Sequence, residues 1–145
     1  MNVNEMTAQQ LARACADAMY ESDRATIGQK VELIDVGPGT ATMQMQVQAH
    51  QTNGHGMCHG GFIFMMADSC FAFACNSHNQ KAVAASAQID FLAPAELGDV
   101  LIAKAREVAV AGRTGHYEIM VTRKSDEQLI AIFRGRSATI KGQLV

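Results

Sequence analysis

A segment near the middle of the chain combines the strongest apolar helix pattern with an acidic residue. Residues 59–75 read as the most hydrophobic helix of the protein, and Phe64, Phe71 and Cys75 recur at i, i+7 and i+11, along one stripe of that helix. Asp68 falls at i+4, inside the stripe. A carboxylate on a buried apolar face is costly unless it is paired or used. We therefore expect Asp68 to have a function; the alternative is that it caps a backbone group or pairs with arginine.

Length and composition indicate one globular domain over residues 1–145. The chain is 48% hydrophobic and 18% charged, and 145 residues suffice to bury a core without staples. Its net charge is −2 and it has no basic run, so we expect neither nucleic acid nor an anionic membrane as partner. No apolar run is long enough to span a bilayer, and the N-terminus lacks the pattern of a signal peptide.

The four cysteines favour a reducing compartment. None of them forms a paired CxxC spacing, and several lie in apolar settings. Free buried thiols are typical of cytoplasmic proteins, whereas disulfides persist in oxidising compartments. The sequence therefore predicts four free thiols and a cytoplasmic location.

The order of elements predicts an α+β layer architecture. Thr7 and Gln10 form a possible capping box for an N-terminal helix over about 7–23. Strands are expected before the apolar helix at 28–36 and 42–48, and after it at 83–91, 100–110, 117–123 and 129–140, with a hairpin turn at 111–115. One helix against a mostly antiparallel sheet leaves a sheet face for another subunit to cover.

Alternation gives the strand at 83–91 two different faces. The small and apolar residues are expected on one face, and the polar residues on the other; the first set is Val83, Ala85, Ala87, Ile89 and Phe91, and the second is Ser86, Gln88 and Asp90. Ser86 either orients a water molecule or is a small residue packed under the helix.

The start of the apolar helix has the features of an anion site. The first N–H groups of a helix lack internal partners and lie at the positive end of its dipole. Glycines at Gly60 and Gly61 would let a ligand oxygen approach those groups closely; close packing of helix on sheet is the alternative. Asp68 lies about 12 Å further along the axis. If both groups act on one atom, a second copy of the helix across a two-fold axis is the natural arrangement.

Three residues before the helix have a metal-like spacing: His55, Cys58 and His59. A zinc site needs three or four ligands, and no fourth is evident nearby, so we expect no metal. His59 more plausibly positions the loop or contacts substrate, and adjacency to His59 does not make Cys58 a nucleophile. Several basic residues are candidates for phosphate contacts or solvated strand edges: Arg113, Arg134, Arg136 and Lys141.

These motifs resemble the hotdog-fold thioesterases of the PaaI (phenylacetic acid degradation) type. The similar segments are Asn53-Gly54-His55, Cys58-His59-Gly60-Gly61, Ala67-Asp68, Ala72 to Ser77, Ile89 to Pro94, Gly98-Asp99, Thr114-Gly115 and Phe133 to Ser137. The resemblance covers about residues 19–142. It implies a hotdog fold, in which a curved antiparallel sheet wraps a long helix, and homodimers that pair again as a dimer of dimers.

The resemblance also implies roles for individual residues. The backbone N–H matching Gly60 polarises the thioester carbonyl, and the acid matching Asp68, from the partner chain, acts as base or nucleophile. Residues matching Asn53, His59 and Ser86 line the site. Gly61, Phe64 and Arg113 are our further substrate-binding candidates, Phe64 at the acyl group and Arg113 at a phosphate.

An acyl-CoA thioesterase without a cofactor is the function these observations favour. Phenylacetyl-CoA or hydroxyphenylacetyl-CoA is the expected substrate, and free acid and CoA are the products. A non-catalytic acyl-CoA-binding module on the same fold is the alternative, because fold does not fix function; retention of Asp68 favours catalysis. A dehydratase or hydratase would need a differently placed acid with a histidine base.

Overall fold

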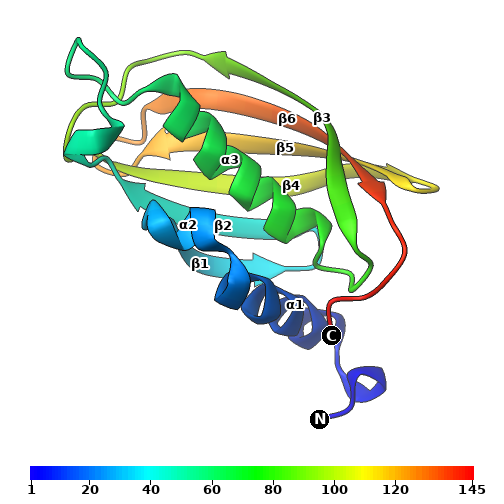
Figure 1. Cartoon of the computed structure of the whole chain (residues 1–145). Helices are drawn as coiled ribbons and strands as arrows, with labels where there is room; N and C mark the ends of the chain where they lie inside the picture. Colours follow the sequence, from blue (N-terminus) through cyan, green and yellow to red (C-terminus); the bar gives the residue numbers. More distant parts are fainter.

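A six-stranded antiparallel sheet curves around one long helix in the computed structural model, which describes all residues from 1 to 145 (Figure 1). The strands follow one another in the sheet in the order β1-β2-β4-β5-β6-β3. They are β1 (Glu32–Gly37), β2 (Thr40–Gln46), β3 (Ala82–Phe91), β4 (Val100–Ala111), β5 (Thr114–Arg123) and β6 (Leu129–Thr139). The central helix is α3 (Gly60–Cys75). The α+β hotdog arrangement expected from the sequence is confirmed.

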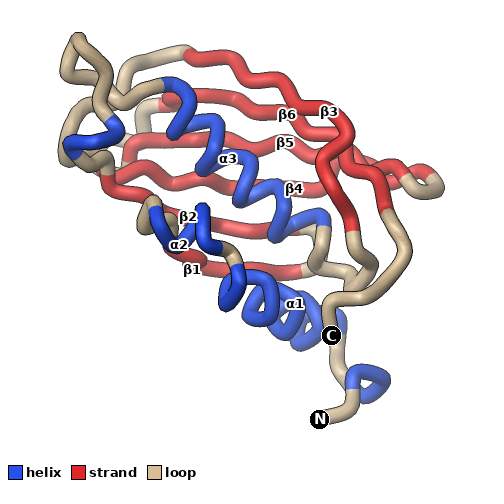
Figure 2. The backbone as a smooth tube through the Cα atoms, in the orientation of Figure 1, coloured by secondary structure: helices blue, strands red, loops and turns tan.

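The N-terminal helix forms as its capping pattern predicts. α1 (Ala8–Ser22) begins after Thr7, whose hydroxyl accepts the N–H of Gln10 while the Gln10 side chain accepts the N–H of Thr7. Its buried residues pack beside β1, at the edge of the sheet (Figure 2). The end of the chain returns to this side, where the Asn79 side chain accepts the N–H groups of Leu144 and Val145. A short 3₁₀ helix, η1 (Val3–Glu5), precedes α1.

The strand expected at 28–36 is wrong in its first part. Gly28 is instead the last residue of a five-residue helix, α2 (Arg24–Gly28), and β1 begins only at Glu32. Asp23 caps α2 by accepting the N–H of Thr26, and Lys30 then takes a positive φ of 56° that ends the helical path. The cap at Asp23 determines the local structure that precedes β1.

The core lies between α3 and the concave face of the sheet. Phe71 and Phe73 of α3 are about 1% exposed and pack on buried side chains of β2, β4, β5 and β6. Gly135 allows the closest approach, since a Cβ there would lie 2.7 Å from the Phe71 ring. All four cysteines are free, buried thiols, as predicted. None of the helices has the length and hydropathy that crossing a bilayer requires.

A bulge in β3 corrects the predicted alternation. The pairing with β6 shifts between Ala84 and Ser86, and opposite residues of an antiparallel pair project to the same face. Ile89 therefore shares the helix-facing side with its partner Phe133. The pairs that place residues on the helix-facing side are Ala87↔Gly135, Ile89↔Phe133 and Phe91↔Ala131, whereas Val83 pairs with Ala138 and lies on the outer face. Val83 was expected on the same face as Phe91.

The β4–β5 hairpin is tighter than predicted, and β5 starts earlier. Ala111 pairs with Thr114, so Gly112 and Arg113 alone form the turn, and Gly112 has a φ of +60°. β3 lies at one edge of the sheet and has no strand on its other side (Figure 1). Its exposed residues include Val83 and Phe91, at 47% and 53%. This edge is therefore an unpaired, partly apolar strand.

Candidate functional site

A hollow of about 410 Å³ lies at the N-terminus of α3. Its lining comes from the loop before α3, the first turns of α3 and the segment after β3: Asn53, Met57, Cys58, Gly60, Ile63, Phe91, Leu92, Ala93, Pro94 and Ala95. Two backbone contacts join the loop and that segment, because the N–H of Cys58 donates to the carbonyl of Ala95 at 2.7 Å and Met57 forms a bridge with Glu96. The structure thus brings Asn53 and Gly60 together.

The two glycines at the start of α3 differ in their hydrogen bonds. His59 is the N-cap, and its Nδ1 accepts the N–H of Gly61 at 2.9 Å. His59 also donates its own N–H to the carbonyl of Gln51. The N–H of Gly60 has no acceptor within the protomer. Capping by His59 therefore satisfies Gly61 and leaves the Gly60 N–H free at the hollow, where the dipole of α3 is positive.

Asn53 both holds the loop and retains a free donor. Its Oδ1 accepts the N–H groups of His55 and Met57, at 2.9 and 3.2 Å. Since the amide oxygen is fixed by these two donors, the Nδ2 group is the one that remains available. Asn53 Nδ2 makes no hydrogen bond within the protein. The hollow is thus bordered by two unused N–H donors, one from the backbone of Gly60 and one from Asn53.

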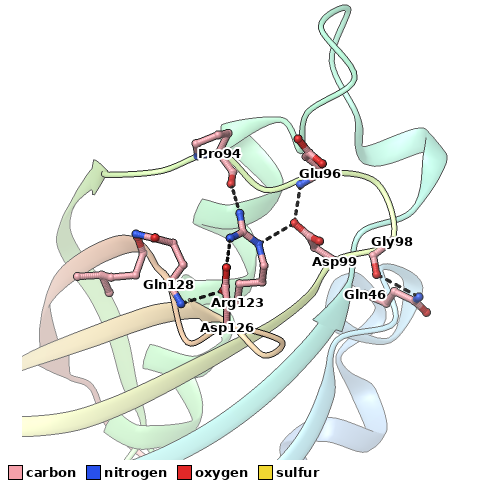
Figure 3. A network of polar contacts seen from close by, with 9 residues as sticks. Gln46, Pro94, Glu96, Gly98, Asp99, Arg123, Asp126 and Gln128 are labelled. Carbon is pink, nitrogen blue, oxygen red and sulfur yellow. Dashed lines mark hydrogen bonds and ion pairs between the residues drawn. The ribbon is translucent and has the colours of Figure 1, made fainter.

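Arg123 holds the segment after β3 that forms one wall of the hollow, and Figure 3 shows its polar contacts. Arg123 donates to the carbonyl of Pro94 at 2.7 Å, to Asp99 at 3.0 Å and to Asp126 at 2.9 Å. Asp99 also accepts the N–H of Glu96. One guanidinium therefore ties the end of β5 to the segment that follows β3. Sequence reasoning did not identify Arg123, because no local pattern links residue 123 to residue 94.

Phe91 is a second residue of the hollow that sequence reasoning missed as a site residue. Its ring covers Gly60, since a Cβ built at Gly60 would lie 2.9 Å from Phe91 Cζ. The side chain is 53% exposed although Phe91 is the last residue of β3 and pairs with Ala131 of β6. An exposed phenylalanine against a glycine with a free N–H is a candidate for contact with an apolar ligand group. The strand pattern placed Phe91 only on an apolar face.

Asp68 lies two turns along α3 from Gly60, outside the hollow. It is half-buried, and it takes part in no ion pair. Burial raises the pKa of Asp68, and the charge of Asp23 raises it further, with no hydrogen bond to oppose them. Within the protomer, Asp68 therefore neither caps a backbone group nor pairs with arginine, which was the alternative expected from the sequence. Asp68 does not line the hollow of Gly60.

The remaining candidates lie apart from this hollow. Phe64 is half-buried and packs edge-to-face on Phe133, with ring centroids 5.1 Å apart. Ser86 lies opposite Arg136, on the outer sheet face and not under α3. It lines a separate hollow with three arginines, namely Arg106, Arg134 and Arg136. Arg113 lies at the hairpin turn, in a hollow at the other end of α3.

The thiol alternative is disfavoured by the local environment. Burial raises the pKa of the Cys58 thiol to about 11, so it is neutral near pH 7. His59 uses its Nδ1 to cap α3, and the Cys58 S–H donates to the backbone carbonyl of His59 at 3.7 Å and not to its imidazole ring. The residues at positions 55, 58 and 59 do not form a cluster of three metal-ligating side chains.

Within one protomer, the two free N–H donors lie apart from the Asp68 carboxylate. Two N–H donors at the start of α3 fit a carbonyl oxygen that gains negative charge. The nearest carboxylate on the helix is Asp68, about 12 Å along its axis, too far to act on the same carbonyl. A second protomer across a two-fold axis beside β3 would place its own α3 antiparallel to the first and bring its Asp68 toward the hollow.

Comparisons with known proteins extend over these same elements. A family model described as the thioesterase superfamily matches residues 55–130, which include α3, β3 and the loop tied by Arg123. The chain is 40% identical over 129 residues to the acyl-coenzyme A thioesterase PaaI of Escherichia coli, and the match covers 89% of this chain and 91% of that protein.

Solved structures give a similar result. The structure of the E. coli PaaI protein from the phenylacetic acid degradation operon superposes with a TM-score of 0.92 at 39% identity, over 94% of this chain and 99% of that one. A variant of the phenylacetic acid degradation protein PaaI of Thermus thermophilus superposes with a TM-score of 0.78 at 32% identity, over 81% of this chain and 100% of that one.

Proposed function

The chain belongs to the thioesterase superfamily and is a thioester hydrolase, and we propose that it hydrolyses acyl-CoA thioesters to free acid and CoA. Phenylacetyl-CoA or hydroxyphenylacetyl-CoA is the proposed substrate, in line with the names of the proteins it is similar to. The observation that carries the proposal is the free N–H of Gly60, beside the Asn53 amide, in a hollow whose other walls are mostly apolar.

The thioester carbonyl is the group that fits the two donors. Attack at the carbonyl carbon moves negative charge onto its oxygen, which the Gly60 N–H and the Asn53 Nδ2 then stabilise by hydrogen bonds. The positive end of the α3 dipole acts in the same direction. His59 supports this arrangement by accepting the N–H of Gly61, and Gly61 leaves room for the His59 ring, because a Cβ there would lie 3.0 Å from its Nδ1.

Asp68 of the partner protomer is the proposed base or nucleophile. As a base it accepts a proton from the attacking water, and that proton later passes to the departing CoA thiolate. As a nucleophile it attacks the carbonyl carbon, the C–S bond breaks and CoA leaves as the thiolate, so that a mixed anhydride forms. Water then hydrolyses the anhydride to the free acid and the Asp68 carboxylate, and the proton released passes to the CoA thiolate. Its raised pKa supports either role, because a carboxylate that is poorly solvated and unpaired is a stronger base.

The proposal requires a homodimer, with a dimer of dimers as the full assembly. The unpaired edge of β3, with Val83 and Phe91 exposed, supports pairing with a second copy. The outer sheet face also exposes apolar residues, including Val108 and Met120 at 54% and 41%, which supports contact between two dimers. The four buried, unpaired thiols support a cytoplasmic location.

Phe91 and Phe64 are the proposed contacts of the acyl group, and the basic residues are proposed contacts of the CoA phosphates. Arg113 and Ser86 lie in other hollows of the protomer, so in this proposal they act on a substrate bound between protomers. The arginine-lined hollow has a local excess of positive charge in a chain of net charge −2, which favours a phosphate ester.

Thiol release from phenylacetyl-CoA tests the proposal. We expect turnover by the wild type and a loss of about 10²-fold or more in kcat/KM for Asp68→Asn, with an unchanged circular dichroism spectrum and assembly state. Asp35→Asn is a matched control, because Asp35 is an exposed acid on β1. Equal rates in Asp68→Asn and wild type would remove Asp68 from the mechanism. Binding of phenylacetyl-CoA without turnover by the wild type would favour a non-catalytic binding module.

A further inference from the structure

A chain of hydrogen bonds joins α2 to α3 next to Asp68. The Thr26 hydroxyl lies 2.7 Å from Asp23 Oδ2 and 2.9 Å from the Ser69 hydroxyl. Thr26 is 1% exposed and Ser69 is 9% exposed, so this chain is shielded from water. Ser69 directly follows Asp68 in α3. Two hydrogen bonds, through the Thr26 hydroxyl, thus connect the Asp23 carboxylate to Ser69, the residue next to Asp68.

The direction of these hydrogen bonds follows from the donors available. An ionised carboxylate only accepts, so the single proton of the Thr26 hydroxyl goes to Asp23. The Ser69 hydroxyl must then donate to the Thr26 oxygen. Asp23 Oδ1 also accepts the N–H of Thr26 at 3.0 Å. Both oxygens of Asp23 therefore accept a hydrogen bond.

Asp23 and Asp68 are two carboxylates in unequal environments. Asp23 has two donors on its oxygens, whereas Asp68 is half-buried and has no ion-pair partner. The hydrogen bonds from Thr26 thus fix the position of the Asp23 carboxylate.

We propose that Asp23, held by Thr26, is a positioning residue that places a fixed negative charge near Asp68 and makes Asp68 the stronger proton acceptor. This inference rests on the proposed function, because it concerns the same base. Asp23 does not touch the hollow of Gly60, and it acts on the reaction only through Asp68. The short helix α2, which the sequence pattern did not reveal, exists at this place because Asp23 caps it.

The titratable groups that follow Asp68 on α3 are uncharged thiols. Cys70 and Cys75 lie further along α3, and burial raises the pKa of each thiol to about 12. Tyr20 on α1 is a neutral phenol whose pKa is raised by burial, then by Glu32 and Asp23. The helix-facing residues of β2 and β4 are alanine, methionine and leucine. In agreement with this geometry, Asp23 is the one charge that acts on the pKa of Asp68, after burial.

The pH dependence of kcat/KM tests this inference in Asp23→Asn. Asparagine caps helices as well as aspartate does, so α2 is retained while the charge is removed. We expect the acidic limb of the profile to move to lower pH, because Asp68 then loses its proton more readily. Glu21→Gln is the matched control, since Glu21 is an exposed acid nearby that does not act on Asp68, and its limb should stay in place.

A second readout does not depend on turnover. The ¹³C chemical shift of the Asp68 carboxyl, followed against pH, should show a lower titration midpoint in Asp23→Asn than in wild type. Thr26→Val removes the anchoring hydroxyl and should move the midpoint in the same direction, whereas Thr26→Ser should restore it.

Two outcomes separate this inference from the proposed function. If Asp68→Asn is inactive but Asp23→Asn changes neither the acidic limb nor the midpoint, the role of Asp23 is overturned and the proposed function stays intact. An active Asp68→Asn would instead refute the proposed base.

Discussion

The ring of Phe91 covers Gly60 so closely that a Cβ at position 60 would lie 2.9 Å from the ring's Cζ. Phe91 is at the end of β3 and Gly60 is the first residue of α3, so this contact joins the edge of the sheet to the helix start. Only a glycine allows the ring and the free N–H of residue 60 to border the same hollow. The contact therefore gives a reason for glycine at position 60: any larger residue would push against the Phe91 ring at the edge of the hollow.

Gly60→Ala should reduce activity without destabilising the fold. The atom that a Cβ would meet is the far end of a half-exposed side chain, which can move aside, and alanine has the higher helix propensity. The displaced Phe91 ring and the new methyl group crowd the N–H donor, so we expect kcat/KM to fall by about 10²-fold, as for the loss of one oxyanion donor.

Thiol release and thermal unfolding, measured together, check this prediction. Gly54→Ala is the control, because a Cβ at Gly54 meets nothing within 4 Å. Unchanged kinetics in Gly60→Ala would contradict a role for the Gly60 N–H. Adding Phe91→Ala to Gly60→Ala should recover part of the loss if crowding by the ring is its cause.

Asp68→Asn should stabilise the protein at neutral pH. The native pKa of Asp68 lies above its ordinary value of 3.8, because burial and the charge of Asp23 disfavour the ionised form. As the pH rises past 3.8, the unfolded chain releases this proton before the native protein does, so this acid lowers stability until the native Asp68 ionises too. Asparagine has no such penalty, so we expect a higher free energy of unfolding for the variant at neutral pH.

Denaturant unfolding of both proteins from about pH 4 to about pH 7, at one fixed protomer concentration, measures this difference. The gap between variant and wild type should be small at the acid end and widen as the pH rises. A gap of constant size would show that packing, and not the charge of Asp68, causes the change in stability.

Local patterns predicted most of the fold. The capping box at Thr7, the apolar helix and the later strands appear as expected, because each depends on residues close in sequence. Two features were not predictable in this way. The bulge near Ala85 is set by pairing with β6, and the helix α2 is set by a single cap at Asp23.

The candidate site was predicted by residue type but not by arrangement. The sequence identified Asn53, Gly60 and Asp68, and the structure groups the first two in one hollow. It missed Phe91 and Arg123, because a strand residue and a distant arginine acquire their places only when β3 and β5 come together in the sheet. Tertiary contacts of this kind leave no spacing in the sequence.

Arg123→Met should reduce activity by loosening the wall of the hollow. The variant loses the bond to the carbonyl of Pro94 and the links to Asp99 and Asp126, so the segment after β3 is less well placed. Misplacement of a binding wall can cost up to about 10²-fold in kcat/KM. We expect faster amide exchange at residues 94–96, measured by hydrogen–deuterium exchange.

A matched control separates this effect from a general loss of charge. Arg13 forms an exposed ion pair with Asp17 within α1, and Arg13→Met should change neither kinetics nor exchange at residues 94–96. Wild-type kinetics in Arg123→Met, despite faster exchange, would mean that the position of Pro94 is unimportant for turnover.

Mixed dimers should regain activity if each site is shared between protomers. Asn53→Asp keeps the oxygen that holds the loop but removes the Nδ2 donor, and Asp68→Asn removes the base, so each variant alone should be nearly inactive. In a dimer of one chain of each kind, one site contains both changes and the other contains neither. Random pairing therefore leaves about a quarter of all sites intact.

Co-expression of differently tagged chains allows the mixed dimer to be purified, and it should release thiol at about half the wild-type rate. If Asn53 and Asp68 of the same chain formed one site, every site would contain a change and the mixed dimer would stay inactive.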